Sequence, residues 1–122
     1  MKVLALDYGR ARTGVAVSDP TGTIARPLGV VERAATPEGL RRVREIVERE
    51  QAERVVVGLP LTLRGERGEQ AKETERFVEA LRAALPVPVE LYDERFTSVL
   101  AEGDDARAAA HLLSDYLERA RR

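Results

Sequence analysis

The sequence contains no cysteine, and only 4 % of its 122 residues are aromatic. Without cysteine, neither a disulfide framework nor a thiolate metal site can form. No apolar run approaches the ~20 residues that a membrane-spanning helix requires, and the N-terminus lacks the basic and long apolar segments of a signal peptide. These absences lead us to expect a mature, cytoplasmic protein.

Lysine is scarce as well, because Lys2 and Lys72 are the only two. The formal net charge is -1, so nucleic-acid binding would require a local basic patch and not a generally cationic surface. The many arginines suit phosphate contacts, although a GC-rich genome would produce the same bias. With 43 % apolar and 34 % charged residues, residues 1–122 are expected to form one soluble domain with a real core.

Hydrophobic patterns predict the secondary structure in chain order. Two apolar runs within Met1–Asp19 flank a turn rich in glycine and arginine, which is typical of a β-hairpin. Thr36 and Pro37 are expected to start a helix that runs to about Gln51. The remaining expected elements are a strand at Ile24–Glu32, with Pro27 favouring an edge position, a strand around Val55–Val57, a helix at Glu69–Leu85, a strand at Val89–Tyr92, a brief helix capped by Thr97 and a closing helix that starts at Asp104 or Asp105.

This order of elements predicts an α/β fold. A hairpin meander followed by crossover connections gives a mixed five-stranded sheet with helices on both faces. The three valines at Val55–Val57 show no alternation, which indicates a parallel strand buried on both sides. The first strand, the valine strand and the last strand are then expected to be parallel neighbours.

Carboxylates follow two of these parallel strands at their carboxyl ends. Asp7 ends the first strand, and Asp93 and Glu94 follow the last one, at the sheet edge where open α/β sheets bind ligands. Asp105, at the start of the closing helix, is placed to join them. Carboxylate oxygens without clustered lysines favour hard divalent cations such as Mg²⁺ or Mn²⁺, and two such ions can support in-line phosphoryl displacement.

Each acid also has a simpler interpretation. Asp7 is placed to accept the turn N–H groups of Gly9 and Arg10. Glu94 is placed to form a surface ion pair with Arg95 or Arg12, and Asp105 to act only as a helix N-cap.

Four groups of residues, in order along nearly the whole chain, resemble the YqgF family, also called RuvX. They are Leu6–Gly9 with Arg12–Ala16 and Ser18–Asp19; Val56–Pro60 with Gly65; Asp93–Ser98; and Asp105 with Ala108, Ala109, Tyr116 and Leu117. The family comprises pre-16S ribosomal RNA nucleases and Holliday-junction resolvases with a ribonuclease H-like fold. The resemblance implies that Asp7, Glu94 and Asp105 are metal-binding, catalytic acids. Strand alternation directs only one of Asp93 and Glu94 toward the site.

The activity implied by this resemblance is metal-dependent endonuclease cleavage of structured nucleic acid, with Mg²⁺ or Mn²⁺ as the cofactor. The substrate would be the 5′ end of a ribosomal RNA precursor or branched DNA. Resolution of a junction needs two symmetric cuts, which favours a homodimer. Five loop arginines at the expected edge of the site are candidates for phosphate contacts, with a solvated surface role as the alternative: Arg10, Arg12, Arg64, Arg67 and Arg95.

Two other functional classes fit parts of the sequence. The connection Phe96–Asp104 is shorter than is usual in the family, which favours a non-catalytic scaffold for ribosome maturation or recombination. Asp7–Gly14 also resembles the phosphate hairpin of actin-like ATPases. Those proteins enclose ATP between two such domains, however, and the sequence has no Walker-type Gly-Lys-Ser/Thr.

Overall fold

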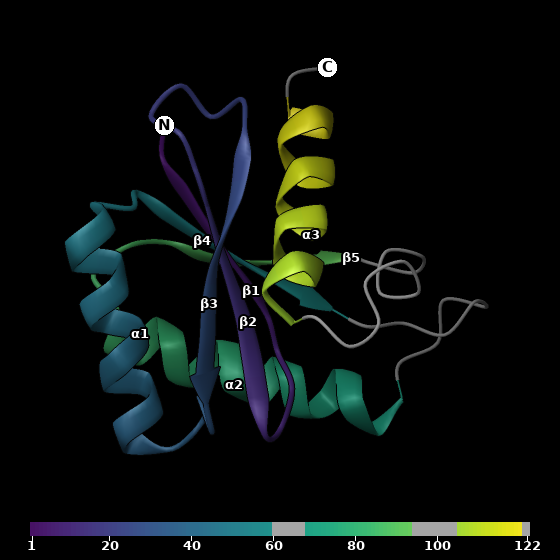
Figure 1. Ribbon diagram of the computed structural model, residues 1–122. Coiled ribbons are helices and arrows are strands. Elements are labelled where there is room, and N and C mark those ends of the chain that lie inside the picture. The colour runs from purple at the N-terminus through teal and green to yellow at the C-terminus, as the bar shows by residue number, and fades with distance from the viewer. Residues whose placement is uncertain (60–67, 94–104, 121–122) are drawn as a thin grey trace.

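The computed structural model describes residues 1–59, 68–93 and 105–120 (Figure 1). Five strands and three helices lie in these ranges, and their order agrees with the sequence analysis. The elements are β1 (Val3–Asp7), β2 (Arg12–Ser18), β3 (Ala25–Glu32), α1 (Pro37–Glu50), β4 (Arg54–Leu59), α2 (Glu69–Ala84), β5 (Val89–Asp93) and α3 (Asp105–Ala120). The brief helix expected at Thr97 lies outside the described residues.

The strands form one mixed sheet in the order β3-β2-β1-β4-β5. β2 is antiparallel to both β1 and β3, whereas β4 is parallel to β1 and to β5. The prediction of three parallel neighbours is therefore confirmed. β3 is an edge strand, as Pro27 indicated, and its register with β2 shifts between Val15 and Ala16. Because β1, β4 and β5 are parallel, their carboxyl ends lie at the same edge of the sheet.

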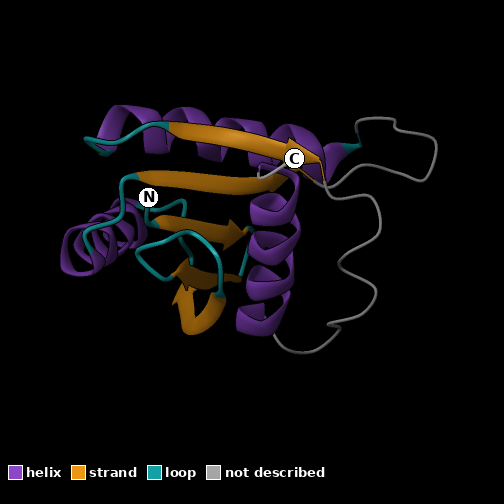
Figure 2. Ribbon diagram, turned by 90° about the horizontal axis from the view of Figure 1, so that it is seen from above, coloured by secondary structure: helices purple, strands orange, loops and turns teal. Residues whose placement is uncertain are grey.

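Helices cover both faces of the sheet, and the central strands supply alternate side chains to the two cores. Leu4 and Leu6 of β1 belong to the cluster that α1 and α2 complete, while Val3 and Ala5 belong to the cluster beneath α3. Val55 and Val57 face α1 and α2, and Val56 faces α3. Figure 2 shows α1 and α3 on opposite sides of the strands. Burial on both faces explains why these strands read as continuous apolar runs.

Local capping residues set the ends of α1. The Thr36 hydroxyl accepts the Gly39 N–H at 3.1 Å, and Pro37 occupies the first turn, where its missing N–H costs nothing. At the other end, Gln51 adopts a left-handed conformation with φ 57°. No helix in the described ranges is both long and apolar enough to cross a membrane.

Asp19 organises the turn between β2 and β3. Its carboxylate accepts the N–H groups of Thr23 at 2.8 Å and Ile24 at 2.9 Å, and the Thr21 hydroxyl. The backbone bond from Ile24, followed by the Thr21 and Thr23 bonds, holds the pKa of Asp19 well below its usual range.

We therefore predict that Asp19→Ala lowers the melting temperature most at neutral pH. A depressed folded-state pKa contributes stability above the unfolded-state value of about 4, and this contribution is lost as the pH falls through the folded-state pKa. Melting curves of both proteins between pH 7 and pH 2 test this prediction. A difference in melting temperature that stays constant over that range would show that the Asp19 carboxylate is not the anchor of the turn.

Candidate functional site

Asp7 is the last residue of β1, and its carboxylate lies on the α3 side of the sheet. Neighbouring residues of an extended strand point to opposite faces, so Tyr8 faces the other way and stacks on Phe77 of α2, with ring centroids 4.5 Å apart. The Gly9 N–H is directed to the Thr13 hydroxyl at 3.4 Å, and the described residues donate no hydrogen bond to the Asp7 carboxylate. In the described residues, Asp7 therefore does not cap the turn by accepting its N–H groups.

A glycine brings Asp105 to Asp7. Gly14 of β2 pairs with Asp7 of β1, and the first turn of α3 packs directly on Gly14. A Cβ atom at position 14 would lie 1.7 Å from the Asp105 carbonyl oxygen and 2.3 Å from its carbonyl carbon. Only glycine allows this approach, so the sequence of β2 fixes where the start of α3 lies.

The two carboxylates influence each other electrostatically. Burial, and to a smaller extent the negative charge of Asp105, together raise the pKa of Asp7 to about 6. Asp105 itself remains about one-third exposed, at 34 %. A half-buried carboxylate that faces a second carboxylate is an unfavourable arrangement for the protein alone, and a bound cation would relieve it.

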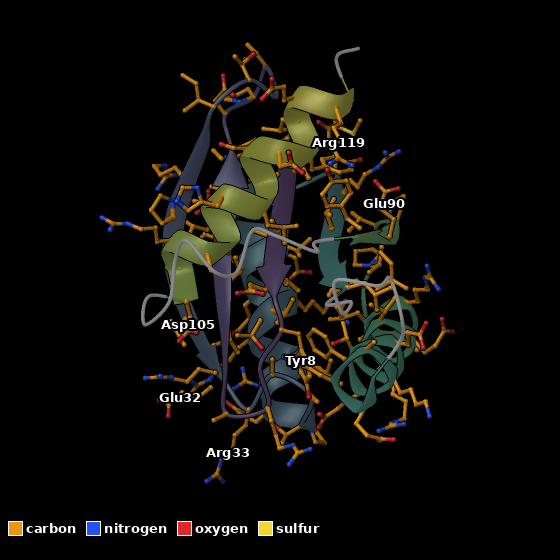
Figure 3. All side chains as sticks on the ribbon, turned by 90° about the vertical axis from the view of Figure 1, so that its right-hand side faces the viewer. Tyr8, Glu32, Arg33, Glu90, Asp105 and Arg119 are labelled. Atoms are coloured by element: carbon orange, nitrogen blue, oxygen red, sulfur yellow. The ribbon has the colours of Figure 1, made fainter. Side chains whose placement is uncertain are left out.

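Arg12 is a cation next to this pair. Its Nε lies 3.3 Å from Oδ2 of Asp105, while 65 % of its side chain remains exposed. An exposed ion pair of this kind contributes little to stability, so Arg12 can exchange Asp105 for another anion at small cost. Figure 3 shows Asp105 and Tyr8 toward the same end of the molecule, with Glu90 and Arg119 toward the opposite end.

Arg10 has a partner that the sequence did not predict. Its Nε and a terminal nitrogen donate to the two oxygens of Glu73 on α2, at 2.9 and 3.3 Å. In sequence, Glu73 looks like one more charge on the solvated face of a helix. Only the packing of α2 against the hairpin tip brings Glu73 to Arg10. The other predicted site residues, Glu94, Arg64, Arg67 and Arg95, lie outside the described residues, as does the Phe96–Asp104 connection.

The donor chemistry at Asp7 and Asp105 fits a hard divalent cation. Both offer carboxylate oxygens, which suit Mg²⁺ and Mn²⁺, and neither sulfur nor imidazole lies with them. Within residues 1–59, 68–93 and 105–120, no group of three or more acidic or histidine side chains forms a complete metal site. Of the three predicted acids, only Asp7 and Asp105 lie in these ranges, because Glu94 lies outside them.

The chain is similar to a set of bacterial proteins over almost its whole length. Three relatives carry the name "Putative pre-16S rRNA nuclease". The relative from Chloroflexus aurantiacus is 42 % identical, with 95 % of this chain and 86 % of the relative covered. The one from Rubrobacter xylanophilus is 44 % identical, with 96 % and 92 % covered. The one from Syntrophomonas wolfei is 37 % identical, with 97 % and 94 % covered.

Solved structures share the fold at lower identity. The Thermus thermophilus RuvC in complex with a Holliday junction substrate superposes with a TM-score of 0.63 at 21 % identity, covering 99 % of this chain and 96 % of that one. The Fowlpox virus resolvase bound to Holliday junction DNA superposes with a TM-score of 0.62 at 13 % identity and full coverage of both chains. These likenesses establish an α/β fold of the ribonuclease H-like, RuvC-resembling type. The RuvX family model, described as Holliday junction resolvase, matches residues 1–119, and the chain therefore belongs to the RuvX family.

Proposed function

We propose that this protein is a divalent-cation-dependent endonuclease that hydrolyses phosphodiester bonds in structured nucleic acid. The observation that carries the proposal is the pair of carboxylates, Asp7 and Asp105, which Gly14 brings together at the carboxyl edge of the sheet. The raised pKa of Asp7 supports it, because a cation would favour the ionised form of both acids. Family membership and the names of the relatives support the same class of reaction.

In this proposal, Asp7 and Asp105 would hold Mg²⁺ or Mn²⁺, with Glu94 as the third acid. Such ions, two in the usual arrangement, would supply the activation of a water molecule and the stabilisation of the leaving oxygen in an in-line displacement. The chain itself positions the acids: β1 holds Asp7 and the first turn of α3 holds Asp105. Arg12 lies beside the acids, and it can bind a substrate phosphate once its ion pair with Asp105 is broken.

Cleavage of two labelled substrates tests the proposal. One is a four-way DNA junction, and the other is an RNA that carries a precursor 5′ extension. We expect cleavage of at least one of them with Mg²⁺ or Mn²⁺, and a loss of about a thousandfold or more for Asp7→Asn. Glu48→Gln is the matched control, because Glu48 is an exposed carboxylate on α1. The preferred substrate identifies RNA processing or junction resolution as the activity.

Two results would reject the proposal. The first is cleavage that persists in Asp7→Asn, because the activity would then come from elsewhere. The second is tight binding of a substrate without cleavage by any metal, in which case the chain acts as a scaffold.

A further inference from the structure

A groove lies on the opposite face of the sheet edge from the two carboxylates. Its main hollow has a volume of about 440 Å³ and runs between the hairpin tip, the turn after β3 and α2, a size typical of ligand pockets. A second hollow of about 350 Å³ shares Tyr8, Arg10 and Glu73 with the first. The Arg10–Glu73 ion pair therefore lines both hollows.

The groove and the carboxylates are linked through two consecutive residues of the chain. Asp7 faces α3, and Tyr8, the next residue, lines the groove. The Arg33 N–H donates to the Ala11 carbonyl at 3.0 Å, which ties the turn after β3 to the hairpin tip. A nucleic-acid strand that crosses this sheet edge would therefore contact both the acids and the groove.

Two arginines with exposed side chains line the groove. The side chain of Arg10 is 85 % exposed, and Arg33 also lines the hollow and is exposed. Figure 3 shows Arg33 projecting from the same end of the molecule as Tyr8. Arg33 has φ 47°, in the left-handed region that favours glycine. This backbone conformation costs stability for a residue other than glycine, so Arg33 is expected to have a role other than stabilising the fold.

Glu73 indicates that the groove binds a nucleobase. A carboxylate repels the phosphate backbone of a nucleic acid, so it would be out of place in a groove that bound phosphate alone. Glu73 nevertheless lines both hollows, and its side chain is only 23 % exposed. The Arg10 hydrogen bond lowers its pKa, which keeps it an ionised acceptor, and its two oxygens retain unused lone pairs. Every unpaired RNA base exposes N–H donors on its Watson–Crick edge, whereas a duplex hides them.

We propose that the groove binds one unpaired nucleotide of the substrate strand, next to the scissile bond. The base lies against Ala11, Ala35 and Tyr8 and donates its N–H edge to Glu73, while Arg10 and Arg33 contact phosphate. This inference rests on the proposed function, because it requires a nucleic-acid substrate. It adds to that function the means by which the protein recognises a single-stranded segment beside a duplex.

Binding without divalent metal tests the groove independently of cleavage. The probe is a fluorescein-labelled RNA hairpin with a short single-stranded 5′ extension, compared by anisotropy in EDTA with hairpins that carry an abasic site at each extension position in turn. We expect one abasic position to weaken binding roughly tenfold. Ala35→Phe fills the groove and should bind all probes equally, whereas Ala83→Phe, at an exposed position on α2, should keep the preference.

Two further variants separate base contacts from phosphate contacts. Glu73→Ala should lose the preference for the intact extension while binding the abasic probe more tightly, because a negative charge is removed. Arg33→Gly should raise the melting temperature and weaken binding to both probes. Gln51→Gly relieves the same left-handed strain at the far end of α1, so it should raise the melting temperature and leave binding unchanged.

Equal binding of intact and abasic probes by the native protein would overturn the inference, as would a preference that survives in Ala35→Phe. Cleavage with Mn²⁺ in the same preparations separates this failure from failure of the proposed function. Cleavage without a base preference rejects only the groove. A base preference without cleavage rejects the nuclease and leaves the groove as a binding site.

Discussion

Asp7→Asn should stabilise the metal-free protein at pH 8 by about 2–3 kcal/mol, although it removes a residue assigned to the reaction. Burial together with the charge of Asp105 raises the folded-state pKa of Asp7 to about 6, whereas the unfolded chain has a value near 3.8. Each pKa unit corresponds to about 1.4 kcal/mol. Ionised Asp7 therefore opposes folding at pH 8, and a neutral amide of the same shape removes that cost.

The sign of the pH dependence follows from the raised pKa. The stability that protonated Asp7 contributes is fully present below about pH 4 and is lost as the pH rises through about 6. The native protein should therefore lose stability relative to Asp7→Asn across this window. Melting curves in EDTA at pH 4, 6 and 8 measure the effect, which corresponds to roughly 10 °C at pH 8 for a domain of this size.

Glu48→Gln is again the control, and its melting temperature should differ little from that of the native protein at each pH. If Asp7→Asn were less stable than the native protein at every pH, Asp7 would be a structural anchor with favourable partners. The assignment of Asp7 as a strained, cation-binding carboxylate would then be wrong.

Gly14→Ala should have the second large effect, because it separates the two acids. The added Cβ would lie 1.7 Å from the Asp105 carbonyl oxygen, so the start of α3 has to move away from β2. Overpacking of this kind costs about 1–3 kcal/mol. A shift of the order of 1 Å in a catalytic group lowers activity about a hundredfold, so cleavage should fall by at least that factor.

Gly68→Ala is the matched substitution, since a Cβ at position 68 meets no atom within 4 Å in the part of the chain that the structure describes. It should change the free energy of unfolding by less than about 1 kcal/mol. Urea unfolding curves and cleavage rates of both variants complete the comparison. Native stability together with full cleavage in Gly14→Ala would mean that the site does not depend on the close approach of α3.

The sequence predicted the fold well because its apolar runs are unambiguous. The valines of β4 have no alternation, and the structure places that strand between β1 and β5, buried by helices on both faces. The end of β1 was also readable, since an apolar run that stops at Asp7 is a strong local signal. Asp105 was ambiguous, because an Asp at a helix start has the same appearance whether it caps the helix or binds a cation.

Features that depend on packing were not readable from the sequence. Gly14 was assigned to the hairpin turn and to a family motif, whereas the structure places it inside β2, where a glycine signals close backbone approach. Arg10 and Arg12 were predicted to contact phosphate, and the structure pairs them with Glu73 and Asp105. Their use as phosphate ligands stays a prediction. Glu73 carries no sequence signal, because its role depends on where α2 packs.

Calorimetric titration of the protein with Mn²⁺ at pH 8 tests most directly whether Asp7 and Asp105 form a cation site. The native protein and Glu48→Gln should bind Mn²⁺ with the same affinity. Asp7→Asn and Asp105→Asn, confirmed as folded by circular dichroism, should each bind it at least tenfold more weakly. Unchanged Mn²⁺ affinity in both aspartate variants would contradict the account.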